Sequence, residues 1–327
     1  MSKTVEIIGV GSPLVDSLAR VSDEWLKANI PGAKGGMELI EADDMQRMLT
    51  DFVDAPEMAP GGSAGNTIFG LARLGLSSAL IGKIGHDTIG QYYHSAAAEA
   101  GLDVTRLKRH ETIPSGHCLS LITPDSERTM RTYLGASAAL EIADITPEDF
   151  RGAKVVHLEG YLLFNRDLAL HVLDCAKTAG CTVSLDLASF EVVHANQDIL
   201  DELLNRYVDI VFANEDEAEA WAASSDPREA LELLSKHCHI AAVKLGAEGA
   251  LIRRGTEFVE VPVIPVRAID TTGAGDLWAA GFLYGLVRGH DLTTCGHYGA
   301  VLGAEVVQLI GAAIPEARWP DIKEIVI

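Results

Sequence analysis

The sequence of 327 residues lacks the long apolar segment that a membrane-spanning helix requires. Apolar residues make up 48% of the chain, yet no unbroken apolar run approaches the roughly 18 residues of such a helix. The opening segment MSKTVEIIGVG has too short an apolar stretch to be a signal peptide, and we expect it to form the first strand of the fold. The sequence therefore predicts a globular chain without a membrane partner, long enough to bury a substantial core.

Cysteine is scarce, and its spacing excludes the common zinc and redox sites. The five cysteines are odd in number and form no C-x-x-C pair: Cys118, Cys175, Cys181, Cys238 and Cys295. This pattern predicts free thiols in a reducing, cytoplasmic compartment.

Basic residues are also few. Twenty-six Lys and Arg stand against 47 Asp and Glu, which gives a formal net charge of −21. Such a charge repels nucleic acid and anionic membranes at long range, so we expect neither as a partner. A small phosphorylated ligand is still compatible with it, because backbone N–H groups and one or two cations can build a local site.

Several motifs of well-known enzyme classes are absent. The sequence has no G-x-x-x-x-G-K-[ST] loop, no H-R-D or D-F-G triplet, no G-x-S-x-G elbow and no H-E-x-x-H. The first strand leads into Gly9-Val-Gly-Ser-Pro-Leu14, which lacks the third glycine of a dinucleotide fingerprint. These absences argue against P-loop enzymes, protein kinases, serine hydrolases of that type and nicotinamide-dependent oxidoreductases.

Short β-branched runs alternate with longer helical patterns along most of the chain. The expected strands are residues 5–11, 78–85, 154–160, 182–188, 208–214 and 240–246. The expected helices include residues 63–75, 89–101, 166–180 and 216–223, several of which end in Gly. This alternation predicts an α/β fold in which helices flank a mostly parallel sheet.

Two segments break this alternation. Residues ~12–55 and ~108–136 carry patterns such as SGHCLSLIT, which are typical of antiparallel strands with one wet face. We expect them to pair as a small separate sheet. No linker or internal repeat divides the chain, so we predict one α/β domain over residues 1–327 with this sheet as a lid.

Seven residues near the carboxyl end, Asp270-Thr-Thr-Gly-Ala-Gly-Asp276, place small residues and an acid before a helical pattern. If Gly273-Ala274-Gly275 opens a helix that runs to about Arg288, these N–H groups lack intrahelical partners and attract an anion. Asp276 is then stabilised as a carboxylate that can take a proton from an alcohol, while the amides stabilise a phosphoryl group. We interpret the motif as the catalytic centre; a capped helix start is the alternative.

A second glycine-rich motif, Gly61-Gly62-Ser63-Ala64-Gly65-Asn66, also precedes a helical pattern. Adjacent glycines permit close approach of a ligand, and Asn66 offers donors and acceptors to a polyhydroxyl compound. A flexible turn with a helix cap explains the motif equally well.

Two further motifs follow expected strands. Asn214-Glu-Asp-Glu217 offers hard oxygen ligands that suit Mg²⁺, although an acidic helix start is the simpler interpretation. Lys244-Leu-Gly246-Ala-Glu-Gly249 contains a lysine suited to phosphate, although a hairpin turn explains this motif too.

Taken together, these motifs resemble those of the ribokinase-like carbohydrate kinases, the family that includes adenosine kinase. The resemblance runs almost end to end. Its motifs occur in the family's order: Gly9 to Asp16, Lys34 to Met37, Gly61 to Asn66, Pro114 to Cys118, Glu127 to Thr129, Asn214 to Glu217, Lys244 to Gly249 and Asp270 to Asp276. The family pattern often has Asn where Ser12 stands here.

The resemblance implies a three-layer fold and a role for each motif residue. Asp276 is implied to be the base, Gly273, Ala274 and Gly275 to be the anion hole, and Arg128 on the lid to approach the transferring phosphate. The implied acceptor site comprises Asp16, Gly61, Gly62, Ser63 and Asn66. The implied ATP site comprises Asn214, Lys244, Gly246, Gly249 and Thr271, with Asn214 and Glu217 holding Mg²⁺ through water. The Gly61-Gly62 pair is implied to be the hinge of a lid that excludes water before transfer.

The substrate is less defined than the reaction. GSPLVD, KGGM and PSGHC resemble the adenosine kinase branch more than ribokinase or the fructokinases. Tyr161 or Phe164 is a candidate for stacking on a nucleobase, although both rings are equally expected in the core. We expect an ATP- and Mg²⁺-dependent kinase of a nucleoside, adenosine favoured, as a monomer or homodimer. A kinase of ribose or fructose is the alternative, and a non-catalytic sensor is disfavoured because it has no need of Asp276.

Overall fold

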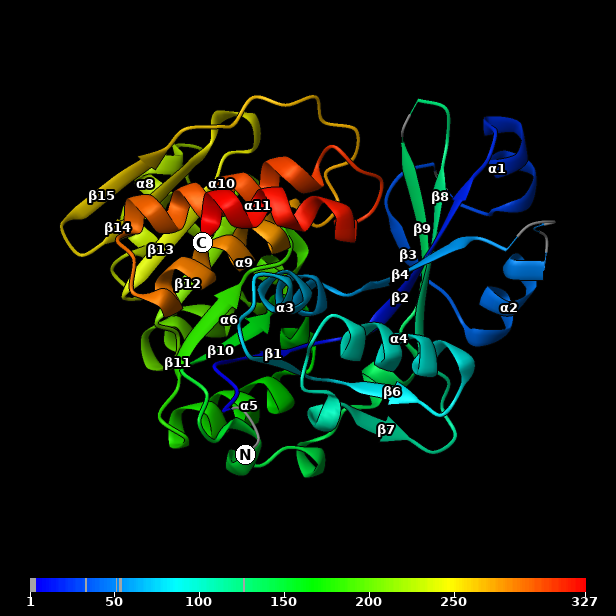
Figure 1. Cartoon of the computed structure of the whole chain (residues 1–327), viewed down its shortest axis with the longest axis horizontal. Coiled ribbons are helices and arrows are strands. Elements are labelled where there is room, and N and C mark those ends of the chain that lie inside the picture. The colour runs from blue at the N-terminus through cyan, green and yellow to red at the C-terminus, as the bar shows by residue number, and fades with distance from the viewer. Residues whose placement is uncertain (1–3, 33, 51, 53–54, 126) are drawn as a thin grey trace.

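The computed structural model describes residues 4–32, 34–50, 52, 55–125 and 127–327. Figure 1 shows a large part built around a long sheet, which we call the base, and a small sheet beside it. No helix within these ranges is long and apolar enough to span a membrane.

Eight strands of the described chain form the central sheet, in the order β15-β14-β13-β12-β11-β10-β1-β5. Their bounds are β1 Ile7–Val10, β5 Ser78–Ile81, β10 Val155–Glu159, β11 Thr182–Asp186, β12 Ile210–Asn214, β13 Ile240–Lys244, β14 Ala250–Arg254 and β15 Glu257–Val261. The strands from β13 to β5 run parallel, and β14 and β15 form an antiparallel edge. The predicted mostly parallel sheet is therefore confirmed.

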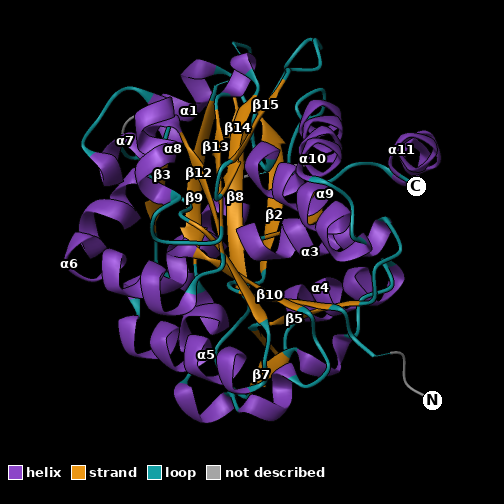
Figure 2. Ribbon diagram, turned by 90° about the vertical axis from the view of Figure 1, so that its left-hand side faces the viewer, coloured by secondary structure: helices purple, strands orange, loops and turns teal. Residues whose placement is uncertain are grey.

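Helices cover both faces of this sheet, as Figure 2 shows edge-on. One face packs against α5 (Arg166–Thr178), α6 (Phe190–Tyr207), α7 (Glu215–Ala222) and α8 (Pro227–Leu234). The other packs against α3 (Ser63–Arg73), α4 (Thr88–Glu99), α9 (Ala274–Arg288), α10 (Leu292–Val306) and α11 (Trp319–Val326). Successive strand side chains point to opposite faces, so burial on both sides explains why these strands are apolar nearly throughout.

The predicted strand at residues 78–85 is wrong in one respect, because it divides at Gly82. Residues before the break form β5, and those after it form β6 (Lys83–Gly85), which pairs with β7 (Lys108–His110) in a separate two-stranded sheet. A Cβ at position 82 would lie 2.5 Å from the carbonyl oxygen of Gly11. The chain therefore turns at a close backbone approach that only glycine allows.

The small sheet has the order β3-β9-β8-β2-β4. Its strands are β2 Leu14–Arg20, β3 Met37–Leu39, β4 Glu57–Gly61, β8 Gly116–Ile122 and β9 Arg128–Tyr133. The prediction of a second sheet is confirmed, but its boundaries need correction: β4 lies outside the predicted segments, and β7 belongs elsewhere. Positions 33, 51, 53–54 and 126 of those segments lie outside the described residues.

The expectation of antiparallel strands is right for the pairs β2–β4 and β8–β9 and wrong for the other two pairs, and the expectation of one wet face is wrong for β8. Strand β2 pairs with β8 in parallel, as does β3 with β9. Helices α1 (Asp23–Asn29) and α2 (Ala42–Thr50) bury one face of the sheet over Leu119 and Leu121. The other face carries Asp16 and Arg128 and is turned toward the base, so β8 is buried on both sides.

Short 3₁₀ turns complete the described chain. They are η1 Val104–Arg106, η2 Gly135–Ala139, η3 Ile142–Asp144, η4 Pro147–Phe150, η5 Gly160–Phe164, η6 Gly246–Glu248 and η7 Glu316–Arg318. Two of them, η5 and η6, follow strands β10 and β13 at the carboxyl edge of the central sheet, where ligands of α/β proteins usually bind.

Candidate active site

Helix α9 begins where the DTTGAGD motif predicts, with Gly273 as its N-cap. The φ of Gly273 is +72°, a left-handed conformation that glycine adopts without strain. The N–H groups of Gly273 and Gly275 have no hydrogen-bond partner among the described residues. The expectation of three unpaired amides is wrong for Ala274, because its N–H donates to the carbonyl of Thr271 at 3.1 Å and closes a turn. Two free amides and the helix dipole remain to attract an anion.

The carboxylate of Asp276 is held by the first turn of α3. The Ser63 hydroxyl donates to Oδ1 at 2.7 Å, and Asn66 donates from Nδ2 to Oδ2 at 2.9 Å. The hydroxyl of Thr67 donates to the backbone carbonyl of Asp276 at 3.1 Å. The two glycine-rich motifs therefore meet at one acid, although 213 positions separate Ser63 from Asp276.

Burial raises the pKa of Asp276 to about 6. The hydrogen bond from Asn66 opposes this rise, the carboxylate of Asp186 adds to it, and Ser63 and the Lys244 ammonium oppose it. An acid with this pKa is ionised near neutral pH and is more basic than an ordinary aspartate. Both properties suit a group that removes a proton from a hydroxyl.

Asp16 faces the base from strand β2 of the small sheet. Burial raises the pKa of Asp16 to about 6, although Arg128 and the Cys118 thiol lower it. A Cβ at Gly61 would lie 2.6 Å from Oδ2 of Asp16, so the glycine makes room for this carboxylate. Asp16 is an acceptor-only group when ionised, which suits a ligand hydroxyl.

Arg128 extends from strand β9 to the base. Its Nη1 donates to the Thr272 hydroxyl and lies 3.4 Å from Oδ2 of Asp270. The side chain is only 10% exposed, and Nε and Nη2 are buried without a hydrogen-bond partner in the described chain. An unpaired buried donor costs roughly 1–3 kcal/mol. An anion bound beside Arg128 would satisfy both nitrogens.

Lys244 ends strand β13 beside the first turn of α9. Its ammonium donates to Oδ2 of Asp186 at 2.8 Å. Burial alone would lower the pKa of Lys244, but Asp186 and Glu217 hold this pKa above its ordinary value, so the lysine stays charged. A Cβ at Gly275 would lie 2.9 Å from Nζ, which explains the small residue there. Asp186 belongs to none of the predicted motifs, and its only sequence signal is its place at the carboxyl end of a buried strand.

Asn214 and Glu217 cap helix α7 reciprocally, as the simpler interpretation of their motif expects. Oδ1 of Asn214 accepts the N–H of Glu217 at 2.8 Å, and Oε2 of Glu217 accepts the N–H of Asn214 at 2.8 Å. Burial raises the pKa of Glu217 to about 7, and Asp186 adds to the rise. Within the described ranges, no group of three or more His, Cys, Asp or Glu side chains is arranged to hold a metal ion directly.

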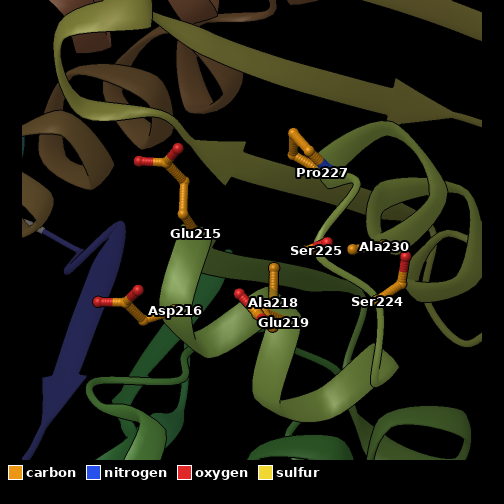
Figure 3. Close-up of a pocket in the computed structure, with 8 residues that line it drawn as sticks. All are labelled: Glu215, Asp216, Ala218, Glu219, Ser224, Ser225, Pro227 and Ala230. Atoms are coloured by element: carbon orange, nitrogen blue, oxygen red, sulfur yellow. The ribbon is translucent and has the colours of Figure 1, made fainter.

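Two cavities in the described part of the chain lie beside these motifs. The first, of about 250 Å³, lies between α7 and α8 (Figure 3). Its lining residues are Glu215, Asp216, Ala218, Glu219, Ser224, Ser225, Pro227 and Ala230. The carboxylates of Glu215 and Asp216 project from α7 away from Pro227 in Figure 3. The second, of about 540 Å³, is lined by residues that include Arg228, Leu245 and Glu260. Each lining includes residues of a predicted motif: Glu215 and Asp216 belong to Asn214–Glu217, and Leu245 and Glu248 belong to Lys244–Gly249.

Gly246 and Gly249 shape the turn between β13 and β14. Their φ angles are +52° and +93°, and the N–H of Leu245 donates to the carbonyl of Gly249 at 2.8 Å. A Cβ at Gly249 would lie 2.1 Å from the carbonyl oxygen of Val261. The hairpin interpretation of this motif is therefore correct, and contact of these residues and of the exposed Thr271 with ATP stays a prediction.

Tyr161 and Phe164 lie in η5, directly after strand β10. Their exposed fractions are 41% and 62%, so the alternative that both are core residues is wrong. The Tyr161 hydroxyl donates to the carbonyl of Ala188 at 3.4 Å. The exposed rings leave aromatic surface for a ligand.

Glu159, the last residue of β10, is another acid that the motif analysis missed. Its side chain is buried, with the residue only 1% exposed. Oε1 accepts the N–H of Ser12 at 2.8 Å, and Oε2 accepts the N–H of Ala64 at 3.0 Å. Burial raises the pKa of Glu159 to about 7, although these two N–H groups oppose the rise.

The chain is similar to known proteins in sequence and in structure. The model of the pfkB family carbohydrate kinases matches residues 37–319. An uncharacterized sugar kinase of Archaeoglobus fulgidus is 30% identical over 247 residues, which cover 74% of this chain and 96% of that protein.

Two solved structures are similar over nearly the whole length. Adenosine kinase from Sinorhizobium meliloti has a TM-score of 0.84 at 35% identity, covering 95% of this chain and 96% of its own. A probable sugar kinase from Rhizobium etli has a TM-score of 0.85 at 34% identity, covering 98% and 99%.

Proposed function

The chain belongs to the pfkB family of carbohydrate kinases, whose ribokinase-like fold it shares, and from that premise we propose that it phosphorylates the primary hydroxyl of a nucleoside, with adenosine favoured. Enzymes of this family are phosphotransferases that use ATP and an alcohol acceptor. In the proposal, Asp276 is the general base and the small sheet is a lid over the acceptor.

One observation carries the proposal. The Asp276 carboxylate lies in the same helix turn as the amides of Gly273 and Gly275, and Arg128 reaches the preceding loop with two buried nitrogens. These amides and nitrogens have no hydrogen-bond partner among the described residues. This set combines a base, an anion hole and a cation. A phosphoryl group that leaves a nucleotide for a hydroxyl needs all three.

The residues fit the triphosphate of ATP, which supplies the phosphoryl group when it is bound. The two free amides and the α9 dipole hold negative charge at one end of the site. Nε and Nη2 of Arg128 are proposed to donate hydrogen bonds to the same phosphate group. Lys244 stays protonated beside Gly275 and adds a positive charge. Gly246, Gly249 and Thr271 are proposed to line the nucleotide. Asn214 and Glu217 are proposed to hold Mg²⁺ through water, since their side chains retain polar atoms beyond the cap.

Asp276 acts on the acceptor by removing its hydroxyl proton as the new bond to phosphorus forms. Ser63 and Asn66 fix the orientation of the carboxylate, so little reorganisation is needed at that moment. Asp16 on the lid is proposed to accept a hydrogen bond from another hydroxyl of the acceptor. Closure of the lid excludes water, which would otherwise compete for the phosphoryl group.

The lid face around Asp16 favours a nucleoside over a free sugar. Strand register aligns Asp16, Cys118, Thr132 and Leu39 in one row across β2, β8, β9 and β3. Register partners point to the same side of a sheet, so Leu39 and its neighbour along the face, Met37, share the side of Asp16. Their exposed fractions are 61% and 49%. A nucleobase offers larger and flatter apolar faces to such residues than a free sugar, whose ring carries a hydroxyl on most of its carbons.

A kinase of a free sugar is the second candidate, because two of the similar proteins are described as sugar kinases. One assay separates the candidates: product formation from ATP with adenosine, inosine, guanosine, ribose and fructose. We expect the highest kcat/KM with adenosine. Phosphorylation of ribose or fructose without any nucleoside would overturn the nucleoside assignment, and no transfer to any of the five would overturn both candidates.

A further inference from the structure

In the described chain, the backbone passes between the small sheet and the rest of the molecule at four crossings. These are residues 11–13, 61–63, 113–115 and 134–136. The first two crossings lie together, since a Cβ at Gly62 would be 2.0 Å from the carbonyl oxygen of Ser12. The last two also lie together, because the N–H of Ala136 donates to the carbonyl of Pro114 at 2.7 Å. Any swing of the small sheet must bend these two pairs.

Glu159 ties the first pair of crossings to the central sheet. Each of its carboxylate oxygens accepts one backbone N–H, from Ser12 in one crossing and from Ala64 just after the other. The residue that accepts both bonds ends β10, the strand between β11 and β1 in the central sheet. A Cβ at Gly11 would lie 2.3 Å from Cδ of Glu159, so the chain packs directly on this carboxyl group. One side chain thus fixes both strands of the crossing.

We propose that Glu159 is a positioning residue that anchors this pair of crossings, so that the small sheet moves as a lid about a fixed axis while Asp276 keeps its orientation. The catalytic part of this inference rests on the proposed function, whereas the anchoring part does not.

The link to Asp276 runs through one turn of α3. Ala64, whose N–H Glu159 holds, lies between Ser63 and Asn66, whose side chains hold the Asp276 carboxylate. Loss of the Glu159 contact frees this turn to follow the lid. The base would then move with the lid instead of staying with the anion hole, and a displacement of about 1 Å lowers transfer strongly.

The second pair of crossings has a different attachment, which provides a contrast. Asp87 accepts the N–H of Ser115 at 3.0 Å and its hydroxyl at 2.6 Å. Asp87 is also the N-cap of α4 and reaches one crossing of its pair. Glu159 differs from Asp87 because it contacts both members of its pair and also the turn beside Asp276.

Hydrogen exchange tests the anchor without reference to catalysis. Glu159→Gln keeps the shape of the side chain but turns an NH₂ group toward one of the two backbone N–H groups. We expect exchange in peptides 11–16 and 62–67 to be faster by about tenfold or more, with peptide 210–214 of the base unchanged. Glu217→Gln is the matched control, because it alters another buried carboxylate that accepts a backbone N–H, away from the crossings. It should leave peptides 11–16 and 62–67 unchanged.

Kinetics of the same variant test the coupling. We expect kcat to fall by about tenfold or more while the KM for ATP stays within about threefold. The ratio of ADP released to acceptor phosphorylated should rise above one, because a lid on a loose axis admits water. Glu159→Asp retains the charge with a shorter side chain, so its kcat and its product ratio should lie between those of the wild type and those of Glu159→Gln. If Glu159→Gln does not fold, Glu159→Asp is the variant to measure.

The outcomes are distinct. Unchanged exchange at both peptides overturns the anchor. Faster exchange with unchanged kcat and an unchanged product ratio overturns the coupling, since Glu159 is then only structural. If the wild-type protein phosphorylates no acceptor, the proposed function fails, and the exchange result still decides whether Glu159 anchors the crossings.

Discussion

Asn66 donates a hydrogen bond from Nδ2 to Oδ2 of Asp276 at 2.9 Å, across 210 positions of the sequence. The bond joins the first turns of α3 and α9, which pack against the same face of the central sheet. It favours the ionised carboxylate and so opposes burial, which raises the pKa of Asp276 to about 6. The acid is thereby held ionised near neutral pH, in an orientation that a neighbouring helix sets.

Replacement of this acid tests the proposed base. Asp276→Asn should lower kcat by about 10²-fold or more, the scale expected for loss of a general base. Binding of ATP and of the nucleoside should change little, because the amides of Gly273 and Gly275 and the lid residues are retained. Steady-state kinetics and calorimetric titration measure the two effects separately. A variant with wild-type turnover would remove Asp276 from the mechanism.

The pH dependence of kcat/KM tests how the carboxylate is tuned. Protonation inactivates a base, so kcat/KM should fall as pH decreases through about 6. Ser63 donates to Oδ1 and lowers the pKa of Asp276, so Ser63→Ala should raise that pKa and move the acid limb to higher pH by about one unit.

Thr67→Val is the control for this shift. Its hydroxyl donates to the backbone carbonyl of Asp276 and not to the carboxylate. The acid limb of this variant should coincide with that of the wild type. Equal displacement in both variants would show that packing of α3, and not the hydrogen bond to the carboxylate, sets the pH dependence.

The sequence predicts the fold well where local pattern decides it. Helix α9 starts at the GAG triplet because unpaired amides and small residues mark a helix start locally. The small sheet is harder to predict, because β2 lies between β4 and β8 and its register depends on pairing with residues about 100 positions away. Alternation along β8 likewise could not show that α1 and α2 cover one side of it and the base covers the other.

Residues of the site are likewise predictable where a local motif marks them and hidden where their partners are distant in the sequence. Asp276 and Asn66 lie in dense motifs, whereas Asp186 and Glu159 each stand alone at the end of an apolar strand. Their partners are far along the chain: Lys244 is 58 positions from Asp186, and Ser12 is 147 positions from Glu159. A lone acid in a strand has no local signal of such a partner. The bond of the Ala274 amide was missed for a different reason, since it depends on the exact turn before α9.

Replacement of Arg128 tests whether the lid takes part in phosphoryl transfer. Arg128→Ala removes the buried Nε and Nη2 that lack partners in the described chain. We expect kcat to fall by about 10²-fold or more, with the KM of the acceptor within about threefold. Lys34→Ala is the control, because this lid cation pairs with Asp23 and Asp125, both on the lid side. It should leave kcat unchanged. A change in Arg128→Ala confined to acceptor affinity would contradict its placement at the phosphate.

Replacement of Gly275 tests the contact between the proposed anion hole and Lys244. The Cβ of Gly275→Ala would lie 2.9 Å from Nζ of Lys244, so the end of this side chain, which donates to Asp186, must shift. We expect the KM for ATP to rise by about tenfold or more, because the displaced ammonium no longer supports negative charge at this helix start. The melting temperature should change little, since the end of a lysine side chain moves easily.

Gly303→Ala on α10 is the matched control: its Cβ would lie 3.6 Å from Trp278, an ordinary contact. It should keep wild-type kinetics and gain about 0.5–1 kcal/mol of stability as a helix-interior glycine replaced by alanine. Equal kinetic effects in the two variants would show that the loss at position 275 comes from helix packing and not from the anion hole.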